Sequence, residues 1–409
     1  MIEAPAKPSP GAASGPERLL AGARAAALAL LIVACAGCPG PGAAKTGQKS
    51  AQPKSGQGGP STAPLDTRTP TPAGVKRIAM FIPHKDLFWR DFLSFMGVAC
   101  EQLGMKLDVH LAQNNRELMK RQLREATQGA GRVDAVVFQN FKDCGEDLLA
   151  IASRAGVPAF LVNAGVGPAS GKPRGRHKSW IGTMLSDGEA AGHALGELLT
   201  KEAKRRGLTD EAGKIHMIAL AGIVSDASSM ERVDGLKRAL KGRKDVVLHQ
   251  VVPTDWSFEE GARKAQVLLK RFPQTSVVWA ASDPLALGAI KSAQALGRVP
   301  GKQILFGGFD WTAEALEAVS AGQLHTTVGG HFMEGGWVAV LLHDYLRGRD
   351  FAPKELTFLT PMRPITKANV ASFLPKIKAA QWGRYDFRAL AAPTGRYAFD
   401  PVETLRGLK

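Results

Sequence analysis

The feature that most constrains the fold is a repeated alternation of short apolar segments with longer amphipathic ones, which begins at Arg77. The apolar segments have the length of strands and are hydrophobic almost throughout, as is typical of parallel strands covered on both faces. The alternation starts again after Asp187. Two similar half-chains predict an α/β protein made of two doubly wound parallel-sheet lobes.

The same alternation sets the expected elements. The expected strands are 77–83, 106–111, 133–139, 158–163, 179–182, 214–220, 246–252, 276–280, 303–306 and 325–328. The expected helices are 89–103, 116–128, 146–154, 187–206, 230–241, 259–272, 285–295, 312–321 and 334–346. Open α/β sheets bind ligands outside the carboxyl ends of their strands. Polar residues that directly follow these strands are therefore the candidate site.

The beginning of the chain is typical of an exported protein. Arg18 and Arg24 precede an apolar run at 25–34, which is too short for a membrane span, and Cys35-Ala36-Gly37-Cys38 follows. Small residues before a cysteine resemble the bacterial lipoprotein cleavage box. We expect residues 1–38 to be a signal peptide that leaves the protein lipid-anchored, through Cys38 or Cys35, on the periplasmic side of a bacterial membrane. An ordinary signal peptide with incidental cysteines is the alternative.

Residues 39–74 are mostly Pro, Gly, Ser, Thr, Ala, Gln and Lys. Such a segment buries too little apolar surface to fold. As a flexible tether it would span roughly 30–36 Å. We expect a disordered tether between the anchor and the folded body, or filler without a tethering role if neither cysteine is lipidated.

The formal net charge of +16 does not indicate a nucleic-acid partner. The basic residues are scattered over predicted helices, where they are typical of solvated faces and of helix C-termini. Export would also separate the protein from nucleic acid. We therefore expect no nucleic-acid binding.

Several short segments, in this order and spacing, resemble type I periplasmic binding proteins of the ribose/galactose class. The segments are 77–83, Phe88-Trp89, Leu103-Gly104, 155–158, 231–235, Ser282-Asp283 and Gly308-Phe309-Asp310. The resemblance implies two lobes joined by three crossovers that close on a ligand.

The resemblance also implies a division of the chain. The crossovers fall near Ser186, Gly330 and Pro361. The N-terminal lobe would then be 75–186 plus 331–360 and the C-terminal lobe 187–330 plus 361–375. A C-terminal extension, 376–409, is longer than sugar binders of this class carry, and we expect it to pack over a lobe.

A sugar has apolar C–H faces and a rim of hydroxyl groups, and aromatic and charged residues at strand ends suit both. The aromatic candidates are Phe88, Trp89, Trp256 and Trp311. Core packing or contact between the lobes is the alternative for each. Arg232 and Asp310 offer charge-assisted hydrogen bonds, unless they only pair with each other. Asp283 either orients its turn or contacts the ligand.

Three departures from the family pattern argue against assuming ribose. Asn163-Ala164 stands where the family often has Asp-Arg, and Ser282 where an Asn usually precedes Asp283. Gly329-Gly330-His331 stands where a Gln is expected near the second crossover. His331 could replace a lost donor, and Asn140 lies at a strand end that faces the same region. Both remain candidate ligand contacts, as do Asn163 and Ser282.

The sequence shows no motif of a familiar enzyme. A Gly-x-Ser-x-Gly elbow, a phosphate loop and a His-Glu-x-x-His motif are all missing. His331 and Glu334 have the spacing of a metal pair, but no third ligand follows nearby. We expect no enzyme activity, no cofactor and no metal.

The sequence thus predicts a monomeric solute-binding protein. It would capture a small polar ligand, expected to be a sugar, and deliver it to the membrane permease of an ABC-type importer. The alternative is a sensory protein whose closed form is presented to a membrane receptor such as a kinase, cyclase or chemoreceptor. The departures at Asn163-Ala164 and Gly330 and the long extension keep that alternative open.

Overall fold

The computed structural model describes residues 74–408 except 353–354 and 392–396. The predicted signal peptide, the lipidation at Cys35 or Cys38 and nearly all of the predicted tether lie outside the described residues. Within the described part of the chain, no helix combines the length and the apolar character that a membrane crossing requires.

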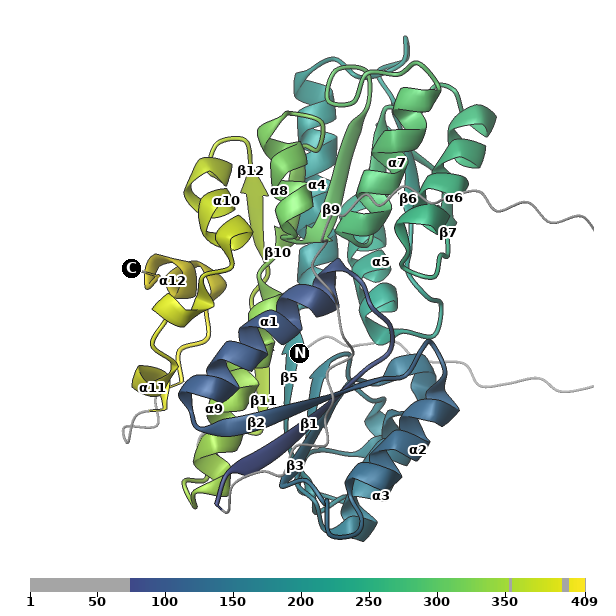
Figure 1. The fold of residues 1–409 in the computed structure, drawn as a ribbon. Coiled ribbons are helices and arrows are strands. Elements are labelled where there is room, and N and C mark those ends of the chain that lie inside the picture. Colours follow the sequence, from purple (N-terminus) through teal and green to yellow (C-terminus); the bar gives the residue numbers. More distant parts are fainter. Residues whose placement is uncertain (1–73, 353–354, 392–396, 409) are drawn as a thin grey trace, which may run out of the picture. The chain divides into compact units, whose positions relative to one another are not determined.

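The first of two six-stranded sheets has the order β11-β5-β4-β3-β1-β2, with every neighbouring pair parallel. Its strands are β1 (Lys76–Ile82), β2 (Met105–Leu111), β3 (Ala135–Phe138), β4 (Ala159–Asn163), β5 (Trp180–Ser186) and β11 (Thr357–Thr360). Helices α1 (Leu87–Gln102) and α9 (Glu334–Leu346) cover one face, and α2 (Arg116–Ala126) and α3 (Gly145–Ala155) the other (Figure 1). This sheet and its helices are the first lobe.

The second sheet has the order β12-β10-β9-β8-β6-β7. Its strands are β6 (Ile215–Leu220), β7 (Val246–Val252), β8 (Val277–Ala280), β9 (Leu305–Asp310), β10 (Thr326–Gly329) and β12 (Arg363–Thr366). One layer is formed by α4 (Gly188–Arg205) and α5 (Ala227–Leu240), the other by α6 (Phe258–Arg271), α7 (Asp283–Ala295) and α8 (Ala313–Ser320). This sheet and its helices are the second lobe. Only β12 among these strands runs antiparallel to its neighbour, β10.

The chain passes between the sheets three times, after β5, after β10 and between β11 and β12. This topology confirms the predicted fold class of two doubly wound parallel-sheet lobes joined by three crossovers. The chain ends in α10 (Val370–Ala379), α11 (Phe387–Leu390) and α12 (Pro401–Arg406). From here on, the C-terminal extension is taken to begin with α10, six residues before the expected boundary at 376.

Strand β9 differs from the expected strand 303–306, because it continues through two glycines to Asp310. Gly307 and Gly308 lie inside the sheet, where helices pack closely on both faces. A Cβ on Gly307 would lie 2.6 Å from Leu195 of α4, and one on Gly308 would lie 2.5 Å from the Asp283 carboxylate of α7. The glycines therefore allow close helix–sheet packing.

Glycines also let α4 and α5 pack with their backbones in contact, which fixes the helix that carries Arg232. A Cβ on Gly192 would lie 2.0 Å from the carbonyl oxygen of Arg232, and one on Gly235 would lie 2.1 Å from that of Glu189. Side chains at either glycine would force the helices apart.

We expect Gly235→Ala to lower the free energy of unfolding by roughly 1–3 kcal/mol, as overpacking of a close contact does. Gly97→Ala is the matched control, because Gly97 is also helical and its added Cβ would meet nothing within 4 Å. Urea unfolding of both variants measures the difference. Equal stability of the two variants would show that α4 and α5 tolerate a wider spacing.

Candidate functional site

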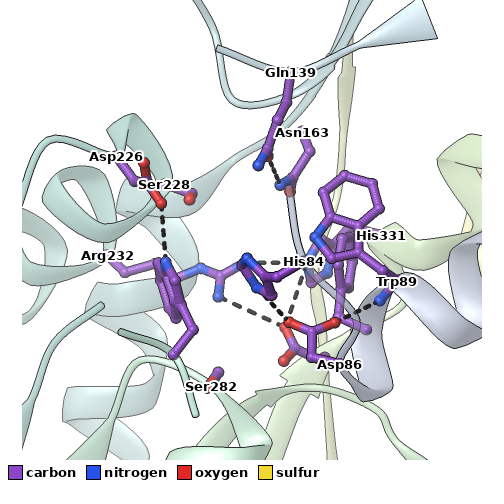
Figure 2. A pocket seen from close by; sticks show the side chains of 13 residues that line it. His84, Asp86, Trp89, Gln139, Asn163, Asp226, Ser228, Arg232, Ser282 and His331 are labelled. Carbon is purple, nitrogen blue, oxygen red and sulfur yellow. Dashed lines mark hydrogen bonds and ion pairs between the residues drawn. The ribbon is translucent and has the colours of Figure 1, made fainter. Parts of the chain in front are cut away.

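A cavity of about 40 Å³ lies where the carboxyl ends of strands from both sheets meet (Figure 2). A single water needs roughly 10–15 Å³ on this scale, so the cavity has room for a small ligand. The lining residues of the first lobe are His84, Asp86, Phe88, Trp89, Gln139 and Asn163. Those that follow strands of the second sheet are Asp226, Ser228, Arg232, Trp256, Ser282, Asp310 and His331.

Arg232 is the buried cation of this pocket. Its guanidinium donates to the carbonyl oxygen of Ala281 at 2.6 Å and to Nε2 of His331 at 3.1 Å. It lies 3.6 Å from the carboxylate of Asp310 and 4.8 Å from the centre of the Phe309 ring. These contacts hold the planar fork in one orientation, which is a requirement for directional hydrogen bonding.

His331 is neutral and has a defined tautomer. An arginine only donates hydrogen bonds, so Nε2 of His331 accepts and the ring proton lies on Nδ1. Burial holds the pKa of His331 well below its usual value, and the nearby Arg232 lowers it further. The ring stacks on Phe88 with centroids 4.7 Å apart. His331 therefore keeps one N–H that no atom of the described residues accepts.

Asp310 carries two signs of a constrained site. Burial raises its pKa well above the usual value, while the guanidinium of Arg232 opposes that rise. Its backbone φ is +117°, a region that residues other than glycine rarely occupy. Asn163 and Trp256, which also line the pocket, have φ values of +61° and +72°. Such strained residues are concentrated at functional sites, where the surrounding fold holds them.

The aromatic side chains come from both lobes. Trp256 lies against the segment that follows β6, where a Cβ on Gly222 would come within 2.0 Å of its ring. Its indole N–H donates to Asp226 at 2.9 Å. Phe88 and Trp89 start α1, whose first turn is capped by the Asp86 carboxylate, which accepts from the Trp89 amide. The rings are thus fixed by hydrogen bonds and close packing.

Direct contacts join the two lobes at the rim of the pocket. The backbone N–H of Lys142, after β3, donates to Asp226 of the second lobe at 3.3 Å. Arg90 of α1 forms a two-pronged ion pair with Glu314 of α8, at 2.6 and 3.1 Å. The structure therefore has the lobes closed around the cavity.

Four polar atoms of pocket residues are buried without a hydrogen-bond partner in the described part of the chain. They are Nε of Arg232, Oδ1 of Asn163, Oγ of Ser282 and Nδ1 of His331. A buried polar group left unpaired costs roughly 1–3 kcal/mol. Two donors, one acceptor and a hydroxyl around one small cavity are the complement of a polyhydroxylated ligand.

Three predicted site residues lie outside the pocket lining. The Asn140 side chain binds backbone, donating to the Gly165 carbonyl and accepting from the Gly145 amide. Asp283 accepts from the Thr312 amide, so it orients the start of α8. Trp311 is fully buried. We therefore leave Asn140, Asp283 and Trp311 out of the proposed site.

Five lining residues were missed by the sequence interpretation. Gln139 is the neighbour of Asn140, and its amide oxygen accepts from Asn163 at 2.7 Å. Asp226 and Ser228 begin α5, which starts three residues before the expected helix at 230–241. His84 and Asp86 follow β1 and form a 2.9 Å ion pair. The serines before Met230 and the acid before Phe88 were available as helix-start signals.

Among the described residues, no group of three or more histidine, cysteine, aspartate or glutamate side chains is arranged to hold a metal ion. His331 and Glu334 are both buried. However, His331 binds Arg232, and Glu334 binds the Thr360 hydroxyl.

The family model described as periplasmic binding protein domain matches residues 78–350. The chain belongs to this family. A solved periplasmic sugar-binding protein from Pseudomonas fluorescens is 31% identical, with a TM-score of 0.72 over 81% of this chain and 100% of that one. The type I resemblance found in the sequence is thereby confirmed.

Two curated relatives are more distant. The ribose import binding protein of Haemophilus influenzae is 26% identical over 56% of this chain and 70% of its own length. The galactofuranose-binding protein of Escherichia coli is 24% identical over 56% of this chain and 68% of its own. Each is named as a binding protein and neither as an enzyme.

Proposed function

We propose that the protein is a solute-binding protein that holds one monosaccharide-sized polyol in the pocket between its lobes. The observation that carries the proposal is the set of four unpaired polar atoms beside aromatic rings around a cavity of about 40 Å³. The relatives named for sugar, ribose and galactofuranose support the same ligand class.

The two kinds of side chain divide the work of recognition. Phe88, Trp89 and Trp256 offer apolar surface for the C–H faces of a sugar ring. Arg232 and Asp310 offer charge-assisted bonds to its hydroxyl groups. Because Asn163, Ser282 and His331 supply different groups from those the family usually carries there, we do not assign ribose as the ligand.

Isothermal calorimetry against D-ribose, D-galactose, L-arabinose and myo-inositol tests this function. We expect at least one of them to bind, and Trp256→Ala to weaken that binding about ten-fold or more through the loss of stacking area. Trp256→Phe is the matched control, since it keeps an aromatic face and should retain most of the affinity. An absence of heat for every sugar, with the protein folded by circular dichroism, would refute the sugar proposal.

We further propose that the protein acts as a monomer at the outer face of a membrane and delivers its ligand to an ABC-type permease. One chain supplies both sides of the pocket, and the first of the two curated relatives is named for import. Lipidation of Cys35 or Cys38 would hold the protein at the membrane. A sensory role, in which the closed form binds a receptor, is the alternative.

The neighbouring genes separate these two roles. Genes for a permease and an ATPase beside this one would support import. A single gene for a membrane kinase, cyclase or chemoreceptor would support sensing and contradict the import proposal.

A further inference from the structure

The C-terminal extension contacts the second lobe, then the first lobe, and then the crossovers between them (Figure 1). Its first helix, α10, packs on α8. The ring centroids of Phe373 on α10 and Trp311, just before α8, lie 5.6 Å apart. Lys378 near the end of α10 forms an ion pair with Glu317 of α8 at 2.5 Å. The beginning of the extension is therefore fixed to the second lobe.

The next part of the extension is fixed to the first lobe. The Trp382 ring packs edge-on against the ring of Phe95 of α1, and its centroid lies 5.7 Å from that of the Phe332 ring. The side-chain amide of Gln102, at the end of α1, donates to the carbonyl oxygens of Gly383 and Tyr385. Further along, the Tyr397 hydroxyl donates to Asp344 of α9, and Phe399 stacks on Trp337 of the same helix.

The last helix, α12, returns to two of the crossovers. Asp400 caps α12 by accepting from the amides of Val402 and Glu403. The same carboxylate forms an ion pair with Arg363, which directly follows the third crossover, at 3.1 Å. Lys376 of α10 donates to the Leu405 carbonyl at 2.6 Å, so both ends of α12 are held.

Pro401, the first residue of α12, lies directly against Gly330 of the second crossover. A Cβ on Gly330 would lie 2.4 Å from Pro401 and 3.2 Å from the ring of Trp311. Gly330 has a φ of +103° and immediately precedes His331, whose ring lines the pocket. The backbone that carries His331 is thus confined between α12 and Trp311.

We propose that α12 is a positioning element for the ligand pocket: through Asp400 and Pro401 it holds the second crossover so that His331 stays between Phe88 and Arg232. Neither Asp400 nor Pro401 lines the pocket, so their effect on the ligand passes through the crossover. The expected effect of α12 on ligand affinity rests on the proposed function. Its expected effect on the conformation of the second crossover does not depend on what the protein binds.

The alternative is that α12 only stabilises the fold. In that case, loosening α12 would lower the unfolding temperature but leave the affinity of the folded protein unchanged. A positioning role requires a change in affinity that disappears when His331 is removed.

The test compares Asp400→Ala, which removes both the cap of α12 and its ion pair with Arg363, with Glu403→Ala. Glu403 is the control because its exposed side chain pairs with Arg406 of the same helix. Affinity for the tightest-binding sugar of the four named above is measured by calorimetry. We expect Asp400→Ala to weaken binding about five- to ten-fold, and Glu403→Ala to leave it unchanged.

The same comparison in a His331→Ala background completes the cycle. We expect Asp400→Ala to change affinity there by less than about two-fold, because the positioned side chain is gone. An equal loss in both backgrounds, or no loss in the first, would overturn the proposal. If Asp400→Ala does not fold, Pro401→Gly takes its place, since it removes the Cβ and Cγ of Pro401 that lie against Gly330 and leaves the Asp400 carboxylate that caps α12.

Hydrogen–deuterium exchange of the ligand-free protein separates this proposal from the proposed function. We expect the peptide covering 329–335 to exchange faster in Asp400→Ala than in Glu403→Ala. Faster exchange in a protein that binds no sugar would support the role of α12 while refuting the sugar ligand. Unchanged exchange would refute the role of α12 whatever the protein binds.

Discussion

Replacing Arg232 with alanine is expected to weaken ligand binding by about a hundred-fold or more. The loss corresponds to about 3 kcal/mol, the scale of hydrogen bonds made by a charged group. The variant also removes the donor that holds Nε2 of His331 and the cation beside Asp310. Three pocket groups therefore lose their arrangement through one substitution, and calorimetry measures the result.

Arg238→Ala is the matched control for this variant. Arg238 lies on the same helix, but its exposed side chain pairs with Glu189 away from the pocket. Arg232→Lys adds a second comparison, because lysine keeps the charge and loses the planar fork. Equal ligand affinity of the Arg232→Ala and Arg238→Ala variants would show that Arg232 does not contribute to ligand binding.

The stability of the protein is expected to fall as pH rises from about 5 to about 8. Burial raises the pKa of Glu334 to about 8, although the Thr360 hydroxyl opposes that rise. The folded protein then keeps a proton that the unfolded chain releases near the usual pKa of 4.5. Over that range the unfolding free energy decreases by up to about 1.4 kcal/mol for each pH unit.

Glu334→Gln is expected to make this pH dependence less steep, because glutamine resembles the protonated acid and does not titrate. Some slope should remain, since burial also raises the pKa of Asp283 to about 7. Urea unfolding at pH 5, 6.5 and 8 measures both proteins. Glu403→Gln, at an exposed position, is the control. If the unfolding free energy of Glu334→Gln depended on pH as steeply as that of the unchanged protein, Glu334 would not be the group that keeps a proton in the folded state.

The fold was predictable because its main signal is local. Strand-length apolar runs between amphipathic helices indicate ten of the twelve strands in the described residues, whereas the edge strands β11 and β12 were not expected from the sequence. The predicted strand 246–252 and helix 334–346 agree with β7 and α9 at both ends. The rule that ligands bind at the carboxyl ends of strands then indicated the pocket region, including Arg232, Trp256 and His331.

The differences between the expected site residues and the pocket lining arise where tertiary packing decides. At the end of β3 the sequence offers Gln139-Asn140, and only the packed structure shows that Gln139 lines the pocket while Asn140 binds backbone. Trp311 is an aromatic residue after a strand, like Trp256, but its indole N–H donates to the Arg363 carbonyl. Which of two such residues reaches the pocket depends on chain segments far away in the sequence.

The extension illustrates the same limit. Its aromatic residues predicted packing against a lobe, but nothing local indicates that Pro401 lies against Gly330, because 70 residues separate them. Such a contact depends on how the crossovers are arranged in space. The hydrophobic periodicity of the sequence does not indicate it.

A crystal structure of the protein saturated with its tightest-binding sugar tests the central claim most directly. We expect one sugar in the pocket, with its ring against Trp256 and its hydroxyl groups bonded to Arg232 and Asp310. A sugar bound outside the pocket, with Arg232 and Asp310 bonded only to each other and to water, would contradict it.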